Sequence, residues 1–363
     1  MSINRLYDSF IQQLTQLQPH ERVTRLRNLA WLLVGIYQSK SVHLSAIAQE
    51  IPSQAKLLSV VKRFERLLNN SALQVRPWYE RVAQSWLQSA VATGEVRLIV
   101  DGSKVGFDHQ LLMVSLAYRR RSIPIAWTWI KAARGHSSAK TQVALLAYIS
   151  SLLPREAKVL IVGDSEFGAV EVLSYLDKQN WHYVLRQKSN NQVQCNSQED
   201  WKSFGSLVQK QGETVWSPGA LLTRHLAYRT NLIAYWKPGE DKPWLLATNL
   251  PTCSSSLKAY ARRMWIEEMF GDFKGHGFDL ESSHLRHFMR LSRLTLAVAL
   301  LYAWLATTGS QVIKNGQRPL VDRSDRRDLS LFQIGLRSVK RRLVNSLPIS
   351  VTFWINLPKL SGG

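Results

Sequence analysis

The segment VRLIVDGS, residues 96–103, decides the fold class of this chain. Four aliphatic residues in five positions, followed by Asp101 and two turn-forming residues, are typical of a short buried strand that ends in an acid. Residues 1 to about 95 instead show helical periodicity and few strand signals, so the pattern changes abruptly at Val96. We therefore expect a helical region followed by a β-rich one.

A second segment, AKVLIVGDSEFG at residues 157–168, has the same form, because its apolar strand ends in Asp164. Around the two segments we expect, in order, strands at 111–119 and 122–130, helices at 140–153 and 169–180, and a strand at 182–188. The resulting order of three strands, helix, strand, helix and strand matches the ribonuclease H core. The pattern predicts an α/β fold with a ribonuclease H-like mixed sheet and helices.

The two strand-ending acids, Asp101 and Asp164, are candidates for one shared site. Neighbouring strands of a sheet can bring such carboxylates within reach of a single metal ion. The alternative is that both are turn residues, since Asp is common at strand ends. Asp164 could also simply cap the helix that follows it.

A third acid lies in YARRMWIEEMFGDFK, residues 260–274, which we call the signature segment. Its spacing Y-x2-R-x3-E-x6-K consists of Tyr260, Arg263, Glu267 and Lys274. On one helix, at about 100° per residue, these four project from one narrow stripe, whereas Glu268 points away from it. An acid between cations suits a site that binds a metal and a phosphate. The alternative is a surface helix in which Arg263 and Glu267 form an ordinary i,i+4 pair.

The charge of the chain indicates its partner. Its 363 residues include 47 Lys+Arg and 26 Asp+Glu, for a net charge of +21, and 45% are hydrophobic. A folded protein this basic is typical of nucleic-acid binding, and the charge argues against a small-molecule hydrolase. Two cysteines, Cys195 and Cys253, make neither a disulfide framework nor a thiolate zinc site, which favours a reducing cytoplasm.

No segment predicts export or a membrane span. The N-terminus lacks the long apolar run and cleavage motif of a signal peptide. The most apolar stretch, residues 294–306, is shorter than the roughly 20 residues that a span needs, so we predict a buried helix there. We expect no membrane association.

Residues 190–255 separate the second acid from the third and carry alternating apolar segments between the turn signals SPG and KPGEDKP. We predict a mostly β insertion. The expected domains are a helical DNA-binding domain at 1–95, the first part of the catalytic core at 96–189, the β-rich insertion at 190–257, the second part of the core at 258–310, and a basic C-terminal helical region at 311–363.

With these residues, the chain resembles the DDE transposases of bacterial insertion sequences, in the cut-and-paste, hairpin-forming group named for its Y, R, E, K signature. The signature segment matches position for position, and the order of the other elements matches over most of the chain. The resemblance implies that Asp101, Asp164 and Glu267 form the catalytic triad and hold two Mg²⁺ ions, with Mn²⁺ as a substitute. It further implies that Arg263 and Lys274 contact DNA phosphates and that Tyr260 helps to orient them.

The resemblance also implies a base that leaves the stack and rests on an aromatic ring of the β insertion. Trp244 is the closest match, with Trp216 and Trp236 as rivals, although a Trp that opens a strand is often a core anchor. Arg186 and Lys188 follow the last core strand and look like the family's pair of backbone-phosphate contacts. A solvated strand end is the alternative.

The N-terminal region contains a candidate helix-turn-helix. Residues 45–68 read as a helix, a short turn at 51–53 and a second helix. The exposed side of that second helix carries Lys56, Lys62, Arg63 and Arg66. A plain helical pair with a solvated basic face is the alternative.

Three functions are open, with the transposase first. It would act on the terminal inverted repeats and on target DNA, as a homodimer in the synaptic complex, associated with the nucleoid. A metal-dependent nuclease of the same fold that cuts without strand transfer is the second, and a catalytically inactive DNA-binding relic is the third. The basic C-terminal tail would either hold DNA nonspecifically or support the pairing of two protomers.

Overall fold

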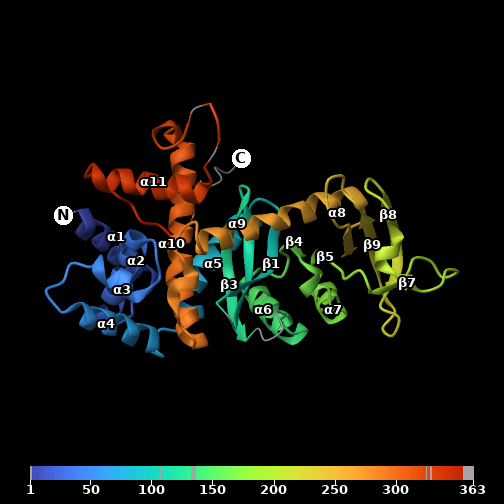
Figure 1. Ribbon diagram of the computed structural model, residues 1–363, viewed down its shortest axis with the longest axis horizontal. Coiled ribbons are helices and arrows are strands. Elements are labelled where there is room, and N and C mark those ends of the chain that lie inside the picture. The colour runs from blue at the N-terminus through green and yellow to red at the C-terminus, as the bar shows by residue number, and fades with distance from the viewer. Residues whose placement is uncertain (1, 107, 132–135, 324, 328, 355–363) are drawn as a thin grey trace.

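A long mixed sheet, flanked by helices, organises the protein (Figure 1). The computed structural model describes residues 2–106, 108–131, 136–323, 325–327 and 329–354. The ten strands follow the order β3-β2-β1-β4-β5-β10-β9-β8-β6-β7. Helices gather at one end of the sheet, and the β-rich part of the chain forms the other end (Figure 1).

Five helices precede the first strand. They are α1 (Ser2–Leu17), α2 (Val23–Ser39), α3 (Leu44–Gln49), α4 (Leu57–Asn69) and α5 (Val75–Val91). Helix α1 shows why they form, because Leu6, Phe10, Leu14 and Leu17 recur every three or four residues and are fully buried or nearly so. The turn between α3 and α4 is longer than the three residues predicted, since α4 begins only at Leu57.

The strands and helices predicted over residues 96–188 are all present. They are β1 (Val96–Val105), β2 (His109–Tyr118), β3 (Arg121–Lys131), α6 (Ala139–Leu152), β4 (Val159–Gly163), α7 (Val170–Lys178) and β5 (His182–Arg186). Strands β1, β4 and β5 are parallel, whereas β2 and β3 are antiparallel additions at one edge. All five residues of β4 are buried, as expected for a central parallel strand covered on both faces.

The prediction that the first strand ends at Asp101 is wrong. Strand β1 continues to Val105, because its last residues pair with β2 as far as Val105 opposite His109. Only the pairing with β4 stops near the acid, at Val100 opposite Gly163. The polar residues after Asp101 thus remain in the sheet as one arm of a hairpin.

The mostly β insertion is present and extends the same sheet. Its strands are β6 (Gln192–Gln194), β7 (Lys202–Ser203), β8 (Thr214–Leu222), β9 (Tyr228–Tyr235) and β10 (Trp244–Thr248). Strand β10 pairs antiparallel with β5, so the insertion is joined to the core edge by backbone hydrogen bonds. A movement of the insertion would therefore be transmitted to β5.

The signature segment is not the single helix that its periodicity predicts. It consists of the end of α8 (Cys253–Tyr260), a 3₁₀ turn at Ala261–Arg263, and α9 (Met264–Phe273). Lys274 follows α9 with φ −95° and ψ −133°, outside the helix. The glycines at 275 and 277 explain the stop, because they favour loop over helix. The apolar residues of the segment form one face of α9, in which Ile266, Met269, Phe270 and Phe273 are buried.

Helix α10 (Phe288–Lys314) is the central helix of the protein, and the predicted burial of residues 294–306 is confirmed. Among the described helices it alone is long and apolar enough to cross a membrane, but 78% of its apolar window is buried inside the protein. Helix α11 (Leu331–Val344) packs against it (Figure 1). Residues 324, 328 and 355–363 of the predicted C-terminal region lie outside the described residues.

Two glycines bring α10 and α11 into backbone contact. A Cβ atom on Gly309 would lie 1.9 Å from the carbonyl oxygen of Leu331, and one on Gly335 would lie 1.9 Å from that of Leu305. No side chain can be accommodated at such distances without moving a helix. The approach of the C-terminal helix to the core therefore depends on these two residues.

We expect Gly335→Ala to lower the free energy of unfolding by about 1–3 kcal/mol, the usual cost of overpacking. The change would otherwise stabilise a helix, because alanine is the better helix former. Urea unfolding followed by circular dichroism measures the effect. Gly275→Ala is the matched control, since a Cβ there meets no atom within 4 Å. Equal stability of the Gly335→Ala protein and the wild type would contradict the close packing.

Candidate active site

Two aspartates meet where β4 ends. The parallel register pairs Val100 with Gly163, so the next residues of the two strands, Asp101 and Asp164, lie side by side. Asp164 also caps the 3₁₀ turn Ser165–Phe167, and its Oδ1 accepts a hydrogen bond of 2.6 Å from the Ser165 amide. The capping role considered from the sequence is thus real, and it engages one of the two carboxylate oxygens.

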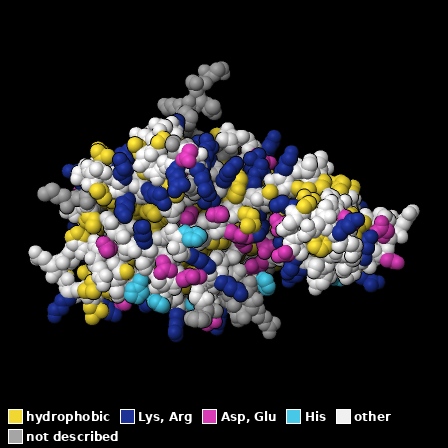
Figure 2. All heavy atoms as spheres, turned by 45° about the horizontal axis from the view of Figure 1, so that its top comes forward, with side chains coloured by type: hydrophobic (Ala, Val, Ile, Leu, Met, Phe, Trp, Pro, Cys, Tyr) yellow, Lys and Arg dark blue, Asp and Glu magenta, His cyan; other side chains and the backbone are white. Residues whose placement is uncertain are grey.

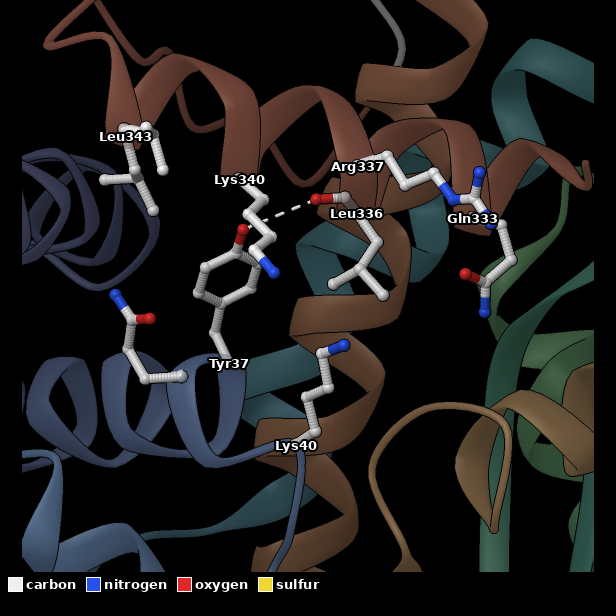
Figure 3. Close-up of a pocket in the computed structure, with 9 residues that line it drawn as sticks. Tyr37, Lys40, Gln333, Leu336, Arg337, Lys340 and Leu343 are labelled. Atoms are coloured by element: carbon white, nitrogen blue, oxygen red, sulfur yellow. Dashed lines mark hydrogen bonds between the residues drawn. The ribbon is translucent and has the colours of Figure 1, made fainter. Parts of the chain in front are cut away.

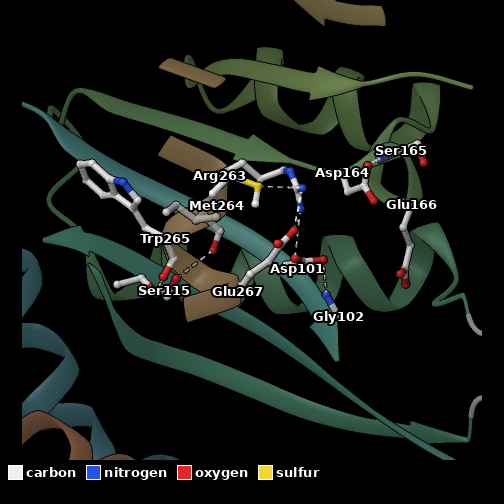
Figure 4. A network of polar contacts seen from close by, with 12 residues as sticks. Asp101, Gly102, Ser115, Asp164, Ser165, Glu166, Arg263, Met264, Trp265 and Glu267 are labelled. Atoms are coloured by element: carbon white, nitrogen blue, oxygen red, sulfur yellow. Dashed lines mark hydrogen bonds and ion pairs between the residues drawn. The ribbon is translucent and has the colours of Figure 1, made fainter. Parts of the chain in front are cut away.

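The third acid, Glu267, is linked to Asp101 through an arginine (Figure 4). Nη1 of Arg263 lies 3.4 Å from Oδ2 of Asp101, and Nη2 lies 2.7 Å from Oε1 of Glu267. Arg263 and Glu267 do form the i,i+4 pair considered from the sequence, but the guanidinium simultaneously bridges to the sheet. Glu268 points away and pairs with Arg121 instead, at 3.3 Å.

All three acids line one cavity of about 450 Å³. Its walls are Asp101, Gly102, Ser103, Asp164, Arg263, Glu267, Phe270, Gly271 and Lys274. Within the described residues, no three His, Cys, Asp or Glu side chains are grouped closely enough to hold a metal ion as they stand. The guanidinium of Arg263 provides the positive charge between Asp101 and Glu267.

Because Asp101 is buried in the cavity, its ionised form needs nearby positive charge for stabilisation. Burial raises the pKa of Asp101 to about 7; the nearby Arg263 lowers it, and the negative charges of Asp164 and Glu267 raise it. Oxygen donors with unneutralised charge are what hard divalent cations bind. The carboxylate oxygens are donors of the kind that hard divalent cations prefer, whereas softer metals prefer Cys and His ligands.

Lys274 lies at the rim of this cavity despite its position outside the helix. Its Nζ donates to the backbone oxygen of Lys104 at 2.6 Å and lies 3.1 Å from Oε1 of Glu281. The structure thus ties the end of the signature segment to the exposed arm of β1. The ammonium is half-buried at the cavity mouth.

Tyr260 is buried behind Arg263. It is 3% exposed, and within the described residues its hydroxyl oxygen has no hydrogen-bond partner. Burial raises its pKa, which the nearby Arg263 and Arg186 lower, so the hydroxyl stays a donor at neutral pH. A buried donor without a partner is costly, and a ligand oxygen would relieve that cost.

The structure brings Trp244 and Arg186 to the same corner. The ring of Trp244 lies 5.0 Å from that of Tyr260, edge to face, and Nη2 of Arg186 donates to the Pro243 oxygen at 3.0 Å. Lys188 lies beyond the strand end and is exposed. Trp216 and Trp236 are half-buried elsewhere in the insertion, the latter bonded to the Glu240 oxygen at 2.9 Å.

The sequence predicts four cations on one exposed face of the candidate helix-turn-helix at residues 45–68, and their surroundings differ. Lys62 pairs with Glu65 at 2.8 Å, and Nε of Arg66 donates to the Lys62 oxygen at 3.2 Å. Arg63 is half-buried over the ring of Phe64, and burial lowers its pKa. Lys56 precedes α4 and is exposed. The prediction that Arg63 belongs to the exposed face is therefore wrong.

A second cavity of about 450 Å³ separates α2 from α11 (Figure 3). Three cations, Lys40, Arg337 and Lys340, line it, and its described lining contains no acid. The hydroxyl of Tyr37 donates to the Leu336 oxygen at 3.4 Å and closes one wall. Figure 2 shows that Lys and Arg side chains form a band over one face, close to a cluster of acids.

Sequence reasoning missed the polar contacts that support the aspartates. Glu166 binds Gln110 and Ser137, which lie on other elements. The only signal in the sequence is Glu166 itself, an acid two residues after Asp164. Nothing in the sequence indicates that Gln110 and Ser137 are its hydrogen-bond partners. Asp272 of α9 is also buried, with 5% of its surface exposed, and the sequence contains no indication of this burial.

Comparison with known proteins places these residues in a family. The transposase DDE domain family matches residues 94–304, which include all three acids. A solved structure of a piggyBac transposase synaptic complex with hairpin DNA aligns with 98% of this chain and 84% of its own, at 11% identity and a TM-score of 0.42. Among curated proteins, none matches the sequence.

The buried Asp272 predicts a pH-dependent stability. Burial raises its pKa to about 7; Arg121 lowers it and Glu268 raises it. Between pH 4 and 7 the unfolded carboxyl ionises while the folded one stays protonated, so the wild type loses stability as pH rises. We expect Asp272→Asn, which cannot ionise, to be about 1–4 kcal/mol more stable above pH 7 and equal to the wild type below pH 4.

Urea unfolding at pH 5 and pH 8 measures this difference. Asp241→Asn, on an exposed loop, is the control and should change the free energy of unfolding by less than about 0.5 kcal/mol. A stabilisation by Asp272→Asn that is the same at both pH values would contradict the buried, protonated carboxyl.

Proposed function

The chain belongs to the transposase DDE domain family, whose chemistry is DNA cleavage and strand transfer, and from this premise we propose that it excises and integrates an insertion sequence. The proposed substrates are the terminal inverted repeats of the element and the target DNA. The proposed fold of the core is ribonuclease H-like, which the strand order β3-β2-β1-β4-β5 with parallel β1, β4 and β5 supports.

One observation carries the proposal: Asp101, Asp164 and Glu267 come from two strands and a helix and line the same cavity. Turn residues and surface ion pairs have no reason to converge in this way. The family match covers all three positions. We propose that the three carboxylates form the catalytic triad.

We assign to the three carboxylates two Mg²⁺ ions, for which Mn²⁺ can substitute. When bound, such ions activate the attacking oxygen and stabilise the leaving oxygen of a phosphodiester. The position of Arg263 supports this assignment, because its guanidinium neutralises Asp101 and Glu267 in place of a cation. The raised pKa of Asp101 supports it too, since a carboxyl of this kind gains most from added positive charge.

The other residues of the site would orient DNA. In the proposed reaction, water first attacks a phosphodiester to free a 3′ hydroxyl, which then attacks the opposite strand or target DNA. Arg263 and Lys274 would bind the phosphate oxygens, and the unpartnered hydroxyl of Tyr260 would donate to one of them. Because both steps exchange phosphate esters at one place, one triad serves both.

The basic surfaces would hold the DNA outside the site. The proposed contacts are Arg186 at the end of β5, Lys188 beyond it, and the cavity between α2 and α11. Lys56 before α4, Lys62 and Arg66 on it, and the half-buried Arg63 would add to them. Their phosphate contacts would be salt-dependent and independent of sequence. We further propose a homodimer in the synaptic complex and a location in the cytoplasm on the nucleoid.

We expect Asp101→Asn, Asp164→Asn and Glu267→Gln each to reduce cleavage at least about a thousandfold while DNA affinity changes less than about threefold, because each removes a charged ligand and no phosphate contact. The assay uses DNA with the inverted repeats that flank the gene, with Mg²⁺ or chelator, and maps strand breaks on a denaturing gel. Glu268→Gln is the matched control, adjacent in sequence but on the other face of α9.

Each outcome separates the candidate functions. Mg²⁺-dependent breaks at the element ends, lost in Glu267→Gln and kept in Glu268→Gln, would establish the transposase. Breaks unrelated to the repeats would favour the plain nuclease. Binding without cleavage by the wild type would favour the inactive relic.

We expect Trp244→Ala to leave the first nick intact and to reduce the hairpin product about tenfold, since base stacking on an aromatic ring contributes about 1–3 kcal/mol. The ring of Trp244 lies edge to face with that of Tyr260, a residue of the proposed site. Trp216→Ala is the control, and native and denaturing gels distinguish nick from hairpin. An equal loss of both products, together with a lower melting temperature, would identify Trp244 as a core anchor.

A further inference from the structure

Glu166 lies two residues after Asp164, and both oxygens of its carboxylate accept hydrogen bonds. Its Oε1 accepts hydrogen bonds from the Ser137 amide at 2.6 Å and from the Ser137 hydroxyl at 2.5 Å. Its Oε2 accepts one from Nε2 of Gln110 at 3.0 Å. The Glu166 backbone oxygen accepts another from Nε2 of Gln142, also at 3.0 Å. One acid thus joins β2, the segment before α6 and the turn that holds Asp164.

The contact between Glu166 and Gln110 depends on Gly102, the residue that follows Asp101. Gln110 lies opposite Lys104 in the β1–β2 register, and its side chain passes over Gly102 to reach Glu166. A Cβ atom at Gly102 would lie 2.1 Å from Nε2 of Gln110 and 3.3 Å from Oε2 of Glu166. The network therefore touches the chain directly after Asp101 and directly after Asp164.

We propose that Glu166 is a positioning residue for the reaction of this site, which fixes the turn of Asp164 against the strand of Asp101. The inference rests on the proposed function. Glu166 does not line the cavity that the three acids share. It therefore acts through the two aspartates and not on DNA or a metal ion.

The network is rigid because water cannot replace its members. Gln110 and Gln142 are each 2% exposed, so their amide donors would lose their partners if the carboxylate were removed. The orientation of the Gln110 amide is also determined, since the opposite one would place its oxygen against the carboxylate. An error of about 1 Å in the aspartates is enough to slow catalysis about a hundredfold.

Four variants test the role: Glu166→Ala, Glu166→Gln, Gln110→Glu, and the exchange Gln110→Glu with Glu166→Gln. We expect Glu166→Ala to slow cleavage about tenfold to a hundredfold with unchanged DNA affinity. Glu166→Gln should stay within about threefold of the wild type, because the amide of Gln110 can rotate and accept from the new amide. Gln110→Glu opposes two carboxylates and should slow cleavage, and the exchange should restore it.

A second measurement does not depend on activity. Hydrogen–deuterium exchange of peptides covering residues 101–103 and 164–168 should rise in Glu166→Ala and Gln110→Glu, and should match the wild type in Glu166→Gln and in the exchanged pair. If Glu166→Ala does not fold, the comparison of Gln110→Glu with the exchanged pair gives the same test. Because this readout needs no DNA, it tests the positioning role even if the wild type fails to cleave and the proposed function falls.

Two results would overturn the inference. Loss of cleavage in Glu166→Gln with unchanged exchange, and no restoration in the exchanged pair, would show that the charge of Glu166 acts directly on the reaction. Cleavage and exchange equal to the wild type in Glu166→Ala would show that the network has no part in the site.

Discussion

The parallel pairing of β1 with β4 is the constraint on which the site depends. Because β4 stops at Gly163, directly opposite Val100, the next residues of the two strands are two aspartates at the same height of the sheet. The pairing needs a residue without a side chain, since a Cβ at Gly163 would lie 2.7 Å from Cγ1 of Val100. Helix α9 then packs its apolar face over the strands and adds Glu267 from above.

This arrangement concentrates negative charge in a protein whose net charge is +21. The local negative charge and the positive net charge are compatible, because the two charge distributions act over different distances. Dispersed cations attract a polyanion over about a Debye length, roughly 8–10 Å in ordinary salt. Inside the cavity, burial raises the pKa of Asp101, the negative charges of Asp164 and Glu267 raise it further, and Arg263 lies between Asp101 and Glu267. A further cation would stabilise the ionised carboxylates of such a site, and a phosphate beside them would increase that stabilisation.

The sequence predicts those parts of the molecule that depend on local pattern. Apolar runs placed β1, β4 and β5 correctly, and helical spacing identified Glu267 over Glu268. It failed where tertiary contacts decide. The continuation of β1 past Asp101 depends on its pairing with β2, and the 3₁₀ turn at Ala261–Arg263 breaks a periodicity that looks uninterrupted. Arg63 is half-buried near Tyr7 of α1, a residue that is distant in the sequence. The partners of Glu166 come from distant segments, so no spacing could indicate them.

The two faces of α9 carry acids in different surroundings. One face presents Glu267 to the cavity, where the side chain is 42% exposed. The opposite face buries Asp272 near Arg121 and Tyr302, and Gln333 of α11 donates to the oxygen of His276 just beyond the helix. Because α11 approaches α10 through Gly309 and Gly335, the C-terminal helix is held against the elements that support α9. The position of Glu267 therefore also depends on contacts of Gly335, 68 positions further along the chain.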